Sequence, residues 1–217
     1  ALEDWSFTSD YANELLNKKF GTKSLKGFGI SDLGDGIVAA GVALHYLNET
    51  KHHQTQHILS VSRIQEDKYV WMDRFTIRNL ELFHSSNDGA ITLIDVLDDT
   101  KSAMGGRMLR RWLALPLKDI NKISKRHQIV DELFNSNLIS EVLSDQISII
   151  GDLERLISKV ATLRMNPREC AKLKVALNSL KPIKEVCEKS SLVPLKDIGR
   201  KIDICEKIRT KIETEIS

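Results

Sequence analysis

Apolar positions recur every three to four residues along most of the chain, which is the spacing of one face of an α-helix. In the first third of the chain this spacing predicts two helices, at residues 9–20 and 35–50. Ser9 or Asp10 is the N-cap candidate of the first helix. The second helix is rich in alanine and contains Gly41, so we expect it to approach a neighbouring element closely.

The segment 58–73 departs from the helical spacing. It is rich in β-branched and aromatic residues, and its part KYVWMD alternates, which predicts a strand. From residue 74 the helical spacing returns and persists. We therefore place a domain boundary near residue 71, between a small mixed domain and a mainly helical one.

Six amphipathic segments follow this boundary. The second of them is one helix or two, ending at Pro116, and the fourth is one long helix or a pair broken around Gly151. One side of the third is formed by Ile123, Val130, Leu133 and Phe134. The expected bounds are residues 74–85, 92–117, 118–134, 138–163, 166–183 and 197–217.

The last two of these segments have the clearest patterns. Asn166 as N-cap, Pro167 at the first helical position and Glu169 two residues later form a capping box. The final segment has no stop residue, which predicts one continuous helix running to the end of the chain. Its apolar face is formed by Ile198, Ile202, Cys205, Ile208, Ile212 and Ile216.

Composition narrows the class of protein. Of the 217 residues, 41% are hydrophobic, so the chain can build a core. Lys+Arg 32 against Asp+Glu 30 gives a net charge of +2, which does not favour a nucleic-acid-binding surface. Three scattered cysteines without a CxxC pair argue against a zinc ribbon or a disulfide framework and favour a reduced, cytosolic protein. No apolar run suits a membrane span, and the opening ALEDWSF, without an initiator Met, suggests an excised fragment.

The segment DTKSAMGGRMLRRWLALPL poses the main chemical question, because two glycines stand beside three arginines. A phosphate-binding loop needs Lys and then Ser or Thr after its last glycine, whereas Arg107 and Met108 follow Gly106. We therefore interpret Gly105 and Gly106 as small residues at a close helix contact.

The three arginines share one helical face, at positions i, i+3 and i+4: Arg107, Arg110 and Arg111. They are candidates for weak contacts with DNA phosphates. The alternative is that they pair with carboxylates and remain half solvated, and Asp95, Asp98 and Asp99 lie just upstream as partners. The same acids would also suit a helix start.

The remaining candidates for chemistry are weak. His53 and His57 have the i, i+4 spacing of a helical metal site, but only Glu49 stands near them to complete it, so a polar loop is the preferred interpretation. The tryptophans Trp5, Trp71 and Trp112 are interpreted as core residues. No catalytic, cofactor-binding or metal-binding residue is predicted.

Two long motifs resemble the MutS family of DNA mismatch-repair proteins. One is MDRFTIRNLELF, and the other is the stretch from DGAITLIDVL through the arginines to Pro116. The IGDLERLISKV segment and SLKGFGISDLGDGIVAAGVALHYLNET add to the likeness. The motif residues, interpreted as structural, are Arg78, Asn79, Leu80, Glu81, Leu82, Leu97, Asp98, Thr100, Met104, Gly105, Gly106, Arg107, Leu109, Arg111, Trp112, Pro116 and Leu117.

The resemblance implies a mainly α fold of two parts. Residues 1–70 would be the end of an α/β connector domain, and residues 71–217 would be the long helices of the lever (core) domain that lead towards a clamp. The family's Phe-x-Glu mismatch reader and its phosphate loop do not occur in this sequence. The chain would thus be a non-catalytic central piece that relays conformational change between the ATPase and the DNA-binding clamp.

The resemblance also implies cofactors and partners for the whole protein. That protein would bind mismatched duplex DNA, hydrolyse ATP with Mg²⁺, form a homodimer and contact a MutL-type partner through the connector. This piece would hold no cofactor, would not contact a membrane, and would lie in the cytoplasm at the nucleoid. Two alternatives remain at this point: a free-standing helical protein-interaction module using the isoleucine face, and an independent metal or phosphoryl-transfer enzyme.

Overall fold

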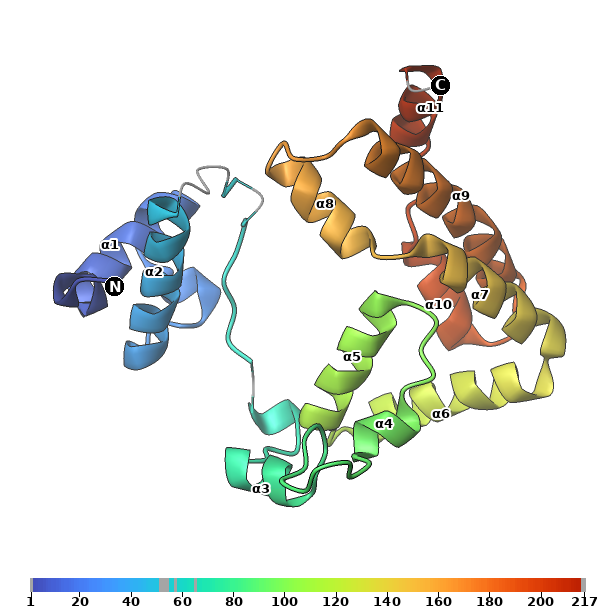
Figure 1. The fold of residues 1–217 in the computed structure, drawn as a ribbon, viewed down its shortest axis with the longest axis horizontal. Helices are drawn as coiled ribbons and strands as arrows, with labels where there is room; N and C mark the ends of the chain where they lie inside the picture. Colours follow the sequence, from blue (N-terminus) through green and yellow to red (C-terminus); the bar gives the residue numbers. More distant parts are fainter. Residues whose placement is uncertain (1, 51–54, 57, 65, 216–217) are drawn as a thin grey trace. The chain divides into compact units, whose positions relative to one another are not determined.

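The computed structural model is mainly helical (Figure 1), which confirms the predicted fold class. It forms two compact units, which we call the N-terminal unit (residues 1–65 with 159–164) and the helical unit (residues 66–158 with 165–217). The structure describes residues 2–50, 55–56, 58–64 and 66–215.

Both helices predicted for the N-terminal unit are confirmed. Their apolar faces meet in one core of buried residues: Ala12, Leu16, Leu25, Ile30, Ile37 and Leu44. The elements of this unit are η1 (Asp4–Phe7), α1 (Ser9–Phe20), η2 (Leu25–Phe28) and α2 (Gly34–Glu49).

The close approach expected of Gly41 is confirmed. A Cβ atom placed on Gly41 would lie 2.5 Å from the Cβ and 2.7 Å from the Cα of Ala12, which is itself fully buried. The backbones of α1 and α2 therefore touch at a point where neither side chain has room to grow.

The strand predicted at residues 58–73 does not form among the described residues. Tyr69 makes one isolated antiparallel bridge with Leu117, and the N–H of Val70 donates to the carbonyl of Pro116 over 2.7 Å. A strand needs a neighbouring strand along its length, and alternation in sequence does not supply one. The α/β character expected of the first part is thus absent from its described residues, which carry helices and extended chain.

The helical unit contains helices of different lengths, the longest of which, α9, contributes most of its buried core. Ile150, Ala176, Ile183, Cys187 and Leu195 are buried together there. The elements are η3 (Glu66–Lys68), α3 (Arg74–Asn79), α4 (Leu93–Leu97), α5 (Ala103–Ala114), α6 (Ile120–Asn135), α7 (Asn137–Ile150), α8 (Leu153–Ala161, which belongs to this unit as far as Ser158), α9 (Pro167–Lys189), α10 (Val193–Lys201) and α11 (Glu206–Glu215).

Capping side chains and a glycine set the ends of several of these helices. The capping box at the start of α9 is confirmed: Asn166 Oδ1 accepts from the N–H of Glu169 over 2.9 Å, and the Glu169 carboxylate accepts from the N–H of Asn166 over 3.2 Å. Gly151, at φ +67°, separates α7 from α8, so the broken pair is the alternative that forms.

One expectation for the later helices is wrong. The final segment is not one helix, because α10 ends at Lys201 and Cys205 adopts φ +48° before α11 begins. Ile198, Ile208 and Ile212 therefore do not share one continuous helical face, and Ile216 lies outside the described residues. Of the apolar residues predicted to share one side of α6, Ile123 and Leu133 are partly buried, whereas Val130 and Phe134 are 63% and 84% exposed.

Candidate functional site

The glycine-arginine segment folds as α5, and its start is set by its own preceding turn. Ser102 caps the helix, its Oγ accepting from the N–H of Gly105 over 3.1 Å. A Cβ on Gly105 or Gly106 would lie 3.3 Å from an atom of the Thr100 side chain. The glycines thus make room for the turn at residues 98–102. The prediction that they contact another helix is wrong, because the atoms nearest to them belong to this turn.

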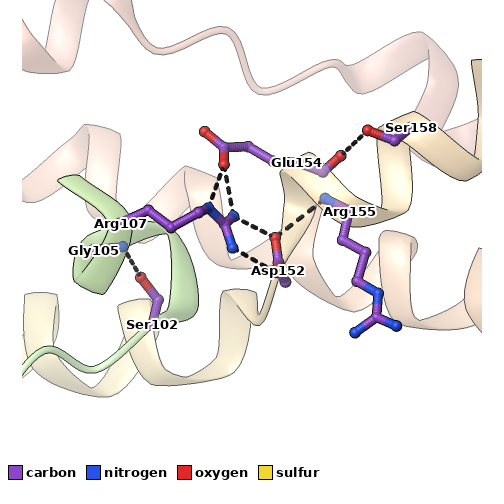
Figure 2. Close-up of polar contacts among 7 residues, drawn as sticks. All are labelled: Ser102, Gly105, Arg107, Asp152, Glu154, Arg155 and Ser158. Atoms are coloured by element: carbon purple, nitrogen blue, oxygen red, sulfur yellow. Dashed lines mark hydrogen bonds and ion pairs between the residues drawn. The ribbon is translucent and has the colours of Figure 1, made fainter. Parts of the chain in front are cut away.

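Arg107, one turn into α5, holds two carboxylates at the start of α8 (Figure 2). Its Nη1 and Nη2 donate to Asp152 Oδ2 and Oδ1 over 3.0 and 2.8 Å, in a bidentate pair. Its Nε and Nη2 donate to Glu154 Oε2 over 2.9 and 2.6 Å. We call Arg107, Asp152 and Glu154 the arginine clamp. A planar guanidinium is suited to such forked contacts, and lysine is not.

Asp152 also caps α8. Its Oδ1 accepts from the N–H of Arg155 over 3.1 Å, and its carbonyl accepts from the N–H of Leu156 over 3.1 Å. A carboxylate at this position satisfies unpaired N–H groups and faces the positive end of the helix. The clamp therefore ties α5 to the residue that starts α8, and the left-handed Gly151 just before it turns the chain into this position.

The contacts of the clamp stabilise the ionised forms of Asp152 and Arg107. Hydrogen bonds from Arg107, the N–H of Arg155 and the charge of Arg107 lower the pKa of Asp152 to about 2. Hydrogen bonds to Asp152 and Glu154 raise the pKa of Arg107 above its ordinary value. An aspartate with so low a pKa is a poor general base near neutral pH. The arrangement suits holding two helices together rather than proton transfer.

The acid titration of Asp152 provides a direct check. Because its pKa in the folded chain lies below its ordinary value, ionised Asp152 stabilises the fold above about pH 4, and this contribution disappears as the pH falls through about 2. We expect the Asp152 carboxyl carbon to titrate with a midpoint near 2 by ¹³C NMR, and to shift upward in Arg107→Ala. A midpoint near 4 in the unaltered chain would contradict the clamp.

The two other arginines of this face have different surroundings. Arg110 lies 6.0 Å from the centre of the Phe83 ring. Its charge also lowers the pKa of Asp95 and Asp98, after larger effects of hydrogen bonds from Thr92 and Thr100 respectively. Arg111 is exposed on α5. Contact of this face with DNA phosphate stays a prediction.

Sequence reasoning missed the partners of Arg107. It looked to the acids just upstream, whereas Asp152 lies 45 residues downstream. The available clue was the order of residues after the helix break at Gly151, where Asp152 stands just before a new helix and Glu154 lies in its first turn. That order predicts a capped helix start but not the cation that it meets.

The motif around Glu81 forms a sharp turn. Glu81 follows the C-cap of α3 and adopts φ +47°, and its carbonyl accepts from the N–H of Leu93 over 3.1 Å. The carbonyl of Leu82 then accepts from Ile94 over 3.0 Å. These bonds bring the start of α4 back beside the end of α3, which explains why the predicted helix at 74–85 ends early.

The three tryptophans are not the core residues that the sequence suggested. Trp5, Trp71 and Trp112 are 49%, 59% and 42% exposed. Trp112, on α5, is covered on one face by Arg126 of α6, whose guanidinium carbon lies 3.5 Å from the ring centre. This contact is a stacked cation–π pair between neighbouring helices.

The metal hypothesis gains no support from the described residues, which contain no group of three or more His, Cys, Asp or Glu able to hold a metal ion. The histidines of the HHQTQH segment, His52, His53 and His57, lie outside the described residues. No helix in the described part is both long and apolar enough to cross a membrane.

Comparison with known proteins places both parts of the chain. Residues 75–217 match the family model for MutS domain III, and residues 1–59 match that for MutS domain II. Proteins named DNA mismatch repair protein MutS are similar over 216 residues in each of three bacteria. Identity is 56% in Christiangramia forsetii, 53% in Flavobacterium psychrophilum and 48% in Bacteroides fragilis, covering 100% of this chain and 25% of each relative. The chain thus spans about a quarter of the length of these relatives.

Proposed function

Because this chain belongs to the MutS family of DNA mismatch-repair proteins, we propose that it relays conformational change between the ATPase and the DNA-binding clamp of a mismatch-repair protein. In this role it is not itself a catalyst. The whole protein would bind mismatched duplex DNA and hydrolyse ATP with Mg²⁺, through parts of the sequence that the relatives have and this chain does not span.

The observation that carries this proposal is the arginine clamp within a matched domain III region. A relay needs elements that move as bodies rather than bend. Arg107 joins α5 to the start of α8 through four hydrogen bonds to Asp152 and Glu154. The buried cluster around Ala176 packs the neighbouring helices together, with Met104 of α5 against it. These contacts support motion of the helical unit as one body.

We also propose the division into a connector part, residues 1–70, and a lever part, residues 71–217. The matched ranges 1–59 and 75–217 support it. By the same reasoning a MutL-type partner would contact the connector part, the whole protein would be a homodimer, and it would act in the cytoplasm at the nucleoid.

The first test is DNA binding by the isolated chain. Fluorescence anisotropy with a matched duplex and a G·T-mismatched duplex, at low and physiological salt, is expected to show weak, salt-sensitive binding without discrimination, or no binding. Such a result fits a relay whose DNA contacts lie elsewhere in the protein. Tight binding with a clear preference for the mismatch would overturn the proposal, and ATP turnover by the isolated chain would overturn its non-catalytic part.

The alternative of a free-standing interaction module is not favoured. It rested on a continuous isoleucine face at residues 198–216, and the helix break at Cys205 divides that face.

A further inference from the structure

A cavity of about 380 Å³ in the N-terminal unit has no part in the relay described above. It lies between the segment at residues 2–5 and the last turns of α2. The walls contributed by these two segments include Glu3, Trp5, His45, Tyr46 and Glu49. Three of these five side chains are aromatic rings and the other two are carboxylates.

The aromatic wall is built and held in place. Trp5 meets Tyr11 edge to face at 4.8 Å and 83°, and meets His45 at 5.2 Å and 68°. His45 is 8% exposed, and its Nδ1 lies 2.8 Å from the Tyr11 hydroxyl. The buried histidine and the tyrosine of α1 thus fix the position of the indole, while 49% of Trp5 remains exposed. A pre-positioned ring binds a ligand without a further ordering cost.

The charged side chains among the described residues that line the cavity have one sign. Trp5 Nε1 donates to the Glu3 carboxylate, which places that charge at the edge of the indole and leaves the ring face unoccupied by it. Glu49 adds a second carboxylate, and no Lys or Arg is among the described residues that line the cavity. Among these residues an anion such as phosphate finds no positive partner. A cation finds ring faces, which carry negative charge density, together with two carboxylates.

We propose that this cavity is a binding site for an arginine side chain of a partner protein. A guanidinium stacks on an aromatic face and donates hydrogen bonds to carboxylates at the same time. Aromatic rings and carboxylates line this same cavity, and none of these residues belongs to the arginine clamp. The site is independent of the clamp on α5 and α8.

The test uses N-acetyl-arginine amide as the probe, and N-acetyl-citrulline amide as its neutral counterpart of nearly the same shape. In ¹H–¹⁵N spectra of the 217-residue chain, the arginine compound is expected to shift the Trp5 indole N–H and the Glu49 amide. A saturating shift with a Kd of about 10 mM is expected from one cation–π contact and exposed ion pairs. Citrulline is expected to leave these positions unchanged.

Two variants sharpen the result. Glu49→Gln removes one carboxylate from an exposed residue, so the fold is retained and the Kd is expected to rise about threefold. Glu14→Gln is the matched control: Glu14 is an exposed carboxylate on α1 that does not line the cavity, and its loss is expected to leave the Kd unchanged. Equal shifts with citrulline, no shift with arginine, or equal effects of the two variants would each overturn the proposal.

Discussion

Replacing Gly41 with alanine is expected to destabilise the N-terminal unit by about 2–3 kcal/mol. The added methyl would lie 2.5 Å from the Cβ of Ala12 and 2.7 Å from its Cα, distances at which the two helices must separate. Alanine gains about 1 kcal/mol of helix propensity over glycine, which is smaller than the cost of this overlap. Because one contacting atom belongs to the backbone, no side-chain rotation relieves it.

The measurement is urea unfolding followed by circular dichroism, with the amides of α1 and α2 followed separately by hydrogen exchange. Gly34→Ala provides the control within the same helix, since a Cβ at Gly34 would meet no atom within 4 Å. Gly34→Ala is expected to be neutral or slightly stabilising. Equal stability of the two variants would show that α1 and α2 do not pack at Gly41.

Features fixed by neighbouring residues were predictable from the sequence. The capping box of Asn166 and Glu169 lies within four residues, and its hydrogen bonds follow from residue type and spacing. Gly41 was predictable for a related reason, since a glycine within an alanine-rich helix needs a packing explanation. Both belong to elements whose periodicity is regular.

Features that depend on distant partners were not predictable. The alternating segment at 58–73 lacks a neighbouring strand in the described structure, and no local property of its residues indicates this. The bond from Arg107 to Asp152 joins residues 45 apart, so many carboxylates competed equally in the sequence. The helix break at Cys205 is a third case. A non-glycine residue at φ +48° is rare, so the sequence gives no reason to expect it there. The N–H of Cys205 donates to Asp203 Oδ1 in the folded chain, and residue type alone does not predict this bond.

The clamp gives the glycines and Arg107 of α5 a shared structural role. Gly105 and Gly106 let the 98–102 turn lie against the start of α5. That turn sets where α5 begins, and hence where Arg107 stands, one turn later. Gly105 and Gly106 therefore position the helix, and Arg107 joins it to α8.

Reversing the charge of Arg107 is expected to uncouple α5 from α8. In Arg107→Glu three carboxylates meet where one guanidinium held two, so the first turn of α8 loses its partner and gains repulsion. Amides of Arg155 and Leu156 are expected to exchange roughly three- to tenfold faster. Arg111→Glu is the matched control, with the same change of charge four residues further along α5, and is expected to leave α8 unchanged.

The same pair of variants tests the relay in the whole mismatch-repair protein. If the clamp transmits motion, Arg107→Glu retains basal ATP hydrolysis but loses its response to mismatched DNA, whereas Arg111→Glu retains both. Faster amide exchange in α8 of Arg107→Glu with an intact response to mismatched DNA would show that the clamp only stabilises the start of α8. The clamp would then have no part in the relay. Slow exchange in Arg107→Glu would mean that α8 is held by its apolar face, through Leu153 packed against the buried cluster, without the arginine.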